Sequence, residues 1–169
     1  HLQTATAGIY AAGDVAETRD LARGCPWVNA IWPEAAVQGR IAGLNMAGRP
    51  VSYKGSLGRN VMRIFDLDVM ALGLANGETA EAVRVLRAGG ASQGWFRGLV
   101  VRDDTLVGAT LIGRIEQGGL LRALIEQGRP LGVLADALLS PNFDIARLLS
   151  MPYMAAGQGA RIHEHIAAS

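Results

Sequence analysis

The chain has 169 residues, half of them apolar and 18% charged, so it can bury a core and wholesale disorder is excluded. The net charge of +1 argues against a nucleic-acid surface, which needs clustered Lys and Arg. A single cysteine excludes an internal disulfide, and no apolar run approaches the ~20 residues of a membrane helix. We therefore expect a cytoplasmic protein that contacts neither nucleic acid nor membrane.

The first fifty residues predict a strand, a polar loop and one helix. Residues 7–12 are apolar throughout, as in a strand buried on both faces of a parallel sheet, and Gly13-Asp14 ends them. The stretch 17–29 is polar and irregular, which indicates a loop. Pro33 suits the first turn of a helix that Gly48 ends. The apolar residues that recur at helical spacing in it are Val37, Ile41 and Leu44.

The middle of the chain predicts an antiparallel sheet. Strand candidates at 60–65 and 69–73 flank an Asp66-Leu67-Asp68 turn, and residues 82–87 alternate at period two. Two β-rich runs follow, with Arg102-Asp103-Asp104 as a hairpin signal between them. Strands joined by short turns favour antiparallel pairing. The two runs cover residues 95–101 and 105–112.

Helices are predicted to follow the sheet. Residues 116–127 place their leucines on one face, and Gly128 supplies a C-terminal stop. Ser140-Pro141 indicates an N-cap and the first position of a short helix that runs through Leu149. Residues 151–169 are small and glycine-rich, which indicates a flexible tail. The predicted fold class is α+β, an antiparallel sheet with helices packed on it.

Two motifs near the N-terminus resemble the closing FAD motif of the pyridine nucleotide-disulfide oxidoreductase family. They are Thr6-Ala7-Gly8-Ile9-Tyr10-Ala11-Ala12-Gly13-Asp14, and Trp32-Pro33-Glu34-Ala35 with Gln38-Gly39-Arg40 and Asn45-Met46-Ala47-Gly48 behind it. Less specific features up to about residue 130 are similar to the branch of rubredoxin and nitrite reductases. These are Leu57-Gly58, Leu106-Val107-Gly108-Ala109 and Leu124-Ile125. For Gly13-Asp14 taken alone, an ordinary strand-to-loop turn is the alternative interpretation.

The resemblance implies roles for particular residues. Asp14 would bind the ribityl chain of FAD, because a carboxylate accepts strong hydrogen bonds from hydroxyl groups. Gly13 would let the backbone approach without a Cβ. Backbone at Trp32, Glu34 and Ala35 would lie beside the flavin O2, where the positive end of a helix favours the reduced, negatively charged ring. NAD(P)H would be the co-substrate, bound by a domain missing from this chain.

The resemblance also implies a C-terminal portion of a larger flavoenzyme that passes electrons from NAD(P)H through FAD to an acceptor. Residues 1–50 would end an incomplete α/β FAD domain, 51–150 would form the C-terminal domain, and 151–169 the tail. The glycine-rich nucleotide turn and a redox-active cysteine pair are missing, so the piece is expected to be inactive alone. Its first strand would lack neighbours and repack or lose order. Its partners would be the rest of the same flavoprotein and a second copy or a redox protein.

No catalytic residue or metal ligand is predicted. Cys25 lacks a Cys-x-x-Cys partner, although its loop could approach the flavin, so its role stays open. His163-Glu164-His165 does not have the spacing of a zinc-protease motif. The electron acceptor, the choice of NADH or NADPH and the oligomeric state also stay open. Two alternatives remain: an independent non-enzymatic α+β protein, or a dimerisation or docking module with contacts at Trp95, Phe96 and residues 131–139.

Overall fold

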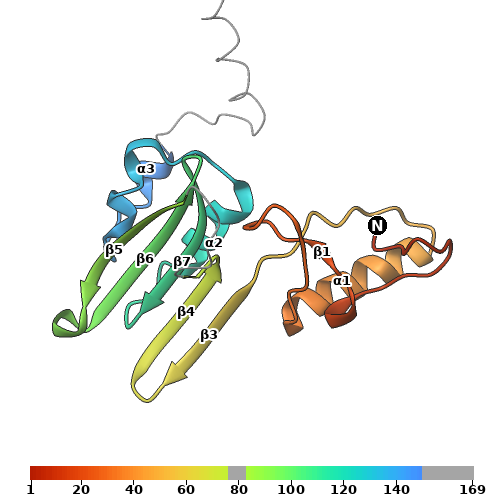
Figure 1. Cartoon of the computed structure of the whole chain (residues 1–169), viewed down its shortest axis with the longest axis horizontal. Helices are drawn as coiled ribbons and strands as arrows, with labels where there is room; N and C mark the ends of the chain where they lie inside the picture. The colour runs from red at the N-terminus through yellow and green to blue at the C-terminus, as the bar shows by residue number, and fades with distance from the viewer. Residues whose placement is uncertain (76–82, 150–169) are drawn as a thin grey trace, which may run out of the picture.

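The computed structural model describes residues 1–75 and 83–149 (Figure 1). Its main element is a five-stranded antiparallel sheet in the order β3-β4-β7-β6-β5. The strands are β3 (Arg59–Ile64), β4 (Leu67–Gly73), β5 (Arg84–Gly90), β6 (Trp95–Arg102) and β7 (Thr105–Ile112). The predicted α+β class and the antiparallel pairing are therefore confirmed.

The hairpin turns follow from the residues that adopt positive φ. Between β6 and β7 the turn residues Asp103 and Asp104 have φ of +46° and +60°, as a two-residue turn matched to the strand twist requires. Between β3 and β4, Ile64 pairs with Leu67, so the turn is Phe65-Asp66. The predicted Asp66-Leu67-Asp68 turn was wrong in position, because strand pairing extends through Leu67 and Asp68.

The core lies at the central strands and the helices that cover them. Successive residues of β6 from Arg97 to Val101 are all buried. Helix α2 (Gly118–Gln127) packs against β7 and β4 and buries Leu121, Leu124 and Ile125. Gly128 ends it with φ of +59°, as predicted.

The chain after α2 forms short turns in place of the predicted helix. Residues 131–139 form the 3-10 turns η3 (Gly132–Leu134) and η4 (Ala137–Leu139) and bury three leucines in the core. Ser140 follows η4, and its carbonyl accepts a hydrogen bond from the Phe143 N–H (3.1 Å). Helix α3 therefore begins only at Ala146 (Ala146–Leu149), and the prediction of a helix opening at Pro141 was wrong. The predicted tail, residues 151–169, lies outside the described residues.

One arginine lies inside the core. Arg97 of β6 is 1% exposed, and its Nη1 donates to Gln117 Oε1 (2.9 Å), the Leu138 carbonyl (2.8 Å) and the Ser140 carbonyl (2.8 Å). Burial lowers the pKa of Arg97, and the nearby Arg114 charge acts in the same direction. The Arg97 guanidinium therefore connects the turn after η4 to strand β6 by hydrogen bonds.

The N-terminal fifty residues lie beside the sheet, next to the edge strand β3 (Figure 1). Helix α1 (Trp32–Met46) begins and ends close to the predicted residues. Residues 7–12 form no strand and make only an isolated bridge at Tyr10, because a parallel strand needs neighbours and no described strand lies beside it. The loop predicted at 17–29 contains a small antiparallel pair, β1 (Thr18–Arg19) and β2 (Pro26–Trp27).

The loop between η1 and α1 is attached to the sheet through a buried aspartate. Asp20 accepts hydrogen bonds from the N–H groups of Ala22 (2.9 Å) and Arg23 (2.7 Å) and from Asn29 Nδ2 (2.6 Å). The Ala22 carbonyl in turn accepts a hydrogen bond from Arg102 of β6. These contacts fix the loop, and with it the N-terminal region, against the sheet.

Candidate functional site

The predicted cofactor residues come together at the start of α1. Residues Gly13–Val15 form a 3-10 turn, η1, that packs on α1. Gly13 has φ of +79°, and a Cβ added to it would lie 3.3 Å from the Ala35 Cβ. Its N–H donates to Gln38 Oε1 (2.8 Å). The glycine is therefore required both for its conformation and for its close approach to the first turn of the helix.

The Asp14 carboxylate faces solvent beside this turn. It makes no hydrogen bond or ion pair with any part of the chain that the structure describes. Val15 and Trp32 are 81% and 82% exposed. The start of α1 and the η1 turn thus present one carboxylate without a partner among the described residues and two exposed large apolar side chains.

The first turn of α1 leaves few free backbone donors. Ile31 is the N-cap residue and makes no side-chain cap, and its carbonyl accepts hydrogen bonds from the N–H groups of Glu34 and Ala35 (both 3.1 Å). Pro33 has no N–H. The Trp32 N–H finds no acceptor among residues 1–75 and 83–149. Trp32 is therefore the residue whose backbone is best placed to donate to an external acceptor.

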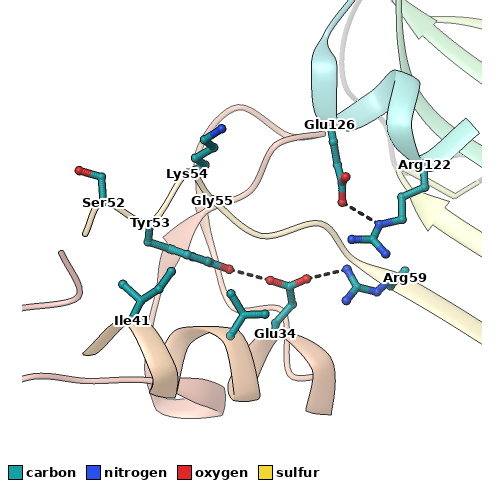
Figure 2. Close-up of a pocket in the computed structure, with 10 residues that line it drawn as sticks. Glu34, Ile41, Ser52, Tyr53, Lys54, Gly55, Arg59, Arg122 and Glu126 are labelled. Atoms are coloured by element: carbon teal, nitrogen blue, oxygen red, sulfur yellow. Dashed lines mark hydrogen bonds and ion pairs between the residues drawn. The ribbon is translucent and has the colours of Figure 1, made fainter. Parts of the chain in front are cut away.

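The Glu34 side chain points away from solvent and is 6% exposed. Its Oε1 accepts a hydrogen bond from Arg59 Nη1 (2.6 Å), which is also an ion pair, and its Oε2 accepts one from the Tyr53 hydroxyl (2.7 Å) (Figure 2). Gln38 Nε2 donates to the same Tyr53 oxygen (3.3 Å). A continuous set of hydrogen bonds therefore links Gly13 to the sheet through Gln38, Tyr53, Glu34 and Arg59.

The surroundings of Tyr53 in this network raise its pKa. Burial raises the pKa of Tyr53 from its ordinary value of 10.0 to about 12; the hydrogen bond from Gln38 lowers it, whereas the bond to Glu34 raises it. The tyrosine therefore remains a neutral hydrogen-bond donor to the carboxylate throughout the neutral pH range.

This network was not predicted from the sequence. Val37, Ile41 and Leu44 recur at helical spacing, but the buried positions of α1 are Glu34, Gln38 and Ala42. Their spacing of four residues was a signal that they share one face. Burial of that face could not be inferred from polarity, because the half-buried partners Tyr53 and Arg59 lie outside the helix.

The remaining motifs take no part in this site. Cys25 is exposed in the turn between β1 and β2, and Arg23 lies over the Trp27 ring at 4.4 Å. Within the described ranges no group of His, Cys, Asp and Glu could hold a metal ion. In the same ranges no helix has the length and apolarity that a membrane crossing needs. His163 and His165 lie outside the described residues.

The fold has the features of the pyridine nucleotide-disulfide oxidoreductases. A Gly-Asp turn packs on a helix that opens at a proline, and an antiparallel sheet with helices follows. The comparisons with known proteins support the family and the fold. The homologues and structural neighbours of this chain are pyridine nucleotide-disulfide oxidoreductases, as the sequence predicted.

Among the curated relatives, the NAD(P)H sulfur oxidoreductase (CoA-dependent) of Pyrococcus furiosus is 27% identical over 138 residues. That match covers 71% of this chain and 31% of the relative, so the chain spans about a third of that protein's length. No family model matches the chain.

Solved structures show the same fold. The NAD-dependent persulfide reductase of A. fulgidus superposes with a TM-score of 0.69 at 22% identity over 86% of this chain and 30% of its own. The reductase in the covalent putidaredoxin reductase–putidaredoxin complex superposes with a TM-score of 0.70 at 19% identity over 89% of this chain and 36% of its own.

Proposed function

We propose that this chain is the C-terminal part of an FAD-dependent NAD(P)H oxidoreductase of the reducing cytoplasm. In this proposal Asp14 binds the ribityl chain of FAD, and the start of α1 faces the pyrimidine edge of the flavin. The observation that carries it is the exposed Asp14 carboxylate, held beside the first turn of α1 and without a partner among the described residues. Residues 1–50 would end the FAD domain and residues 51–150 would form the C-terminal domain.

The residues of this chain would bind and orient the cofactor. Asp14 would accept hydrogen bonds from ribityl hydroxyls, and Gly13 would let the cofactor approach the backbone. The Trp32 N–H and the positive end of α1 would face the flavin O2 and stabilise negative charge there. Ala35 would hold the η1 turn at the correct distance through its contact with Gly13. Bound FAD, reduced by NAD(P)H, would supply the redox chemistry itself.

The test uses the longer protein that this proposal requires, purified with its cofactor. The Asp14→Ala variant is expected to lose FAD affinity by roughly 10- to 100-fold, because each hydrogen bond to a charged group contributes about 1.5–3 kcal/mol. The exposed Asp136→Ala serves as the matched control. Flavin absorbance and equilibrium dialysis measure the bound FAD. Unchanged FAD affinity in Asp14→Ala would contradict the assignment.

A second measurement tests whether the site in this chain is incomplete. The 169-residue chain mixed with FAD is expected to leave the flavin fluorescence largely unchanged, because most FAD contacts would come from the upstream part of the FAD domain. Tight stoichiometric binding would show that the chain carries a complete site.

The alternative function is a dimerisation or redox-partner docking module, and the β3–β4 hairpin favours it. Phe65 at its tip is 94% exposed, and an apolar cavity of about 320 Å³ lies nearby between Leu67, Ile112 and the Trp95-Phe96 pair. The other exposed apolar residues of the hairpin are Val61, Met62, Ile64 and Leu67. One structural neighbour was solved in a covalent complex with putidaredoxin.

Light scattering after size exclusion separates the two forms of this alternative. A stable dimer that Phe65→Ser converts to a monomer would support dimerisation through the hairpin. A monomer at all concentrations would favour docking of a redox protein.

A further inference from the structure

A cavity of about 330 Å³ lies where the N-terminal region meets the sheet (Figure 2), and Asp14 is not among the residues that line it. Four separate segments supply its wall: α1, the connection at residues 52–55, β3 and α2. Lys54, the single lysine of the chain, lies at its upper edge in Figure 2, whereas Arg59 and Arg122 enter from the right.

The cavity brings together three cationic and two acidic side chains. Both oxygens of Glu34 are occupied, by Arg59 and by Tyr53. Glu126 Oε1 accepts from Arg122 Nε at 2.7 Å, a pair four residues apart on α2. Each acid is thus matched by one arginine, and Lys54 makes no hydrogen bond or ion pair with the described part of the chain. The cavity wall therefore carries one excess positive charge.

Free donors remain for a ligand. Arg122 contacts Glu126 through Nε, so neither of its terminal nitrogens has a partner among the residues that the structure describes. A guanidinium presents its donors in a planar fork that matches the oxygens of a carboxylate or a phosphate. The Lys54 ammonium adds up to three more donors.

The opposite wall is apolar. Val37 and Ile41 of α1 line it, and the Tyr53 ring lies beside them. Val37 is 47% exposed although it recurs at helical spacing with Ile41, and both side chains line the cavity. The wall suits a short hydrocarbon stem better than a free ion.

We propose that this cavity binds an oxyanion of the carboxylate or phosphate type that carries a short apolar stem. Lys54 and the free nitrogens of Arg122 would hold the oxyanion, and Val37 and Ile41 would contact the stem. The site does not involve Asp14. Oxyanion binding and the proposed role in a flavoenzyme are therefore independent, and either proposal can fail without the other.

Calorimetric titration of the 169-residue chain tests the proposal with four probes: inorganic phosphate, butyl phosphate, hexanoate and, at matched ionic strength, chloride. Saturable binding of butyl phosphate or hexanoate is expected, with inorganic phosphate weaker and chloride without effect. At a probe concentration ten times Kd, Tm should rise by about 3–6 °C. Whether butyl phosphate or hexanoate binds more tightly identifies the oxyanion. Equal responses to all four salts, or no saturable binding, would overturn the proposal.

Variants link the binding to the named residues. Lys54→Ala and Arg122→Ala should each weaken binding roughly tenfold, as loss of one charge-assisted hydrogen bond does. Glu126→Gln should tighten it, because it removes the acid that competes for Arg122. The matched control is Arg84→Ala, an exposed arginine on β5 at the far edge of the sheet from β3. Equal affinity in all four variants would overturn the assignment even if the chain binds the probe.

Discussion

Removal of the Glu34 carboxylate should destabilise the protein far more than removal of an exposed carboxylate. In Glu34→Ala the Arg59 and Tyr53 donors both lose their acceptor, at 2.6 Å and 2.7 Å. Each hydrogen bond to a charged group contributes about 1.5–3 kcal/mol, and solvent reaches Arg59 only in part, so we expect a loss of about 2–4 kcal/mol.

The assay is thermal unfolding followed by circular dichroism, with urea titration as a second measurement. For a chain of this size 1 kcal/mol corresponds to about 2–4 °C, so Tm should fall by about 4–16 °C. Glu34→Gln keeps one oxygen acceptor and should fall between Glu34→Ala and the wild type.

The control is Glu126→Ala, which removes an exposed ion pair within α2. Pairs of this kind contribute about 0.3–0.5 kcal/mol, so Tm should fall by at most about 2 °C. If Glu34→Ala and Glu126→Ala lowered Tm equally, the network between α1 and β3 would not stabilise the fold.

Three further predictions concern other parts of the structure. Because the pKa of Tyr53 is raised from 10.0 to about 12, the folded state holds this proton more strongly than the unfolded state, and the resulting stabilisation is present below pH 10 and lost as pH rises toward 12. Urea titration across this pH range should show the loss in the wild type, and Tyr53→Phe should abolish it. Gly73→Ala should lower the free energy of unfolding measured by urea titration by about 3 kcal/mol or more, because Gly73 has φ of +57° and a Cβ would lie 2.3 Å from the Val107 carbonyl oxygen. Unchanged stability would show that this close approach does not exist. Arg97→Ala should lower stability by about 3–5 kcal/mol, since it leaves buried acceptors without a donor, whereas Arg84→Ala should change it by less than about 0.5 kcal/mol.

Local signals were sufficient to predict most of the sheet. Two β-rich runs and the Arg102-Asp103-Asp104 turn between them located β6 and β7 to within a residue, because a two-residue turn with positive φ fixes the register of both strands. Pro33 and Gly48 bounded α1 for equally local reasons.

The predictions from the sequence were wrong where contacts with residues far away in the chain determine the structure. Residues 7–12 have the composition of a buried strand, but a strand forms only beside another, and the described chain provides none there. Ser140-Pro141 has a helix-start pattern, yet burial of Phe143 and the Arg97 hydrogen bonds hold the segment in a turn. For the candidate site, family resemblance selected Gly13 and Asp14, whereas Tyr53 and Arg59 could not be assigned to it because they join it only through tertiary contacts.

The polar inner face of α1 limits how this helix can move. An apolar face can slide by a turn and still be buried, but Glu34 and Gln38 have acceptors and donors at only one azimuth and one axial position. Rotation about the helix axis would leave the buried Glu34 carboxylate without hydrogen-bond partners, at a free-energy cost comparable to that of unfolding the segment. Any rearrangement near Asp14 must therefore carry α1, Tyr53 and the start of β3 together as one rigid unit.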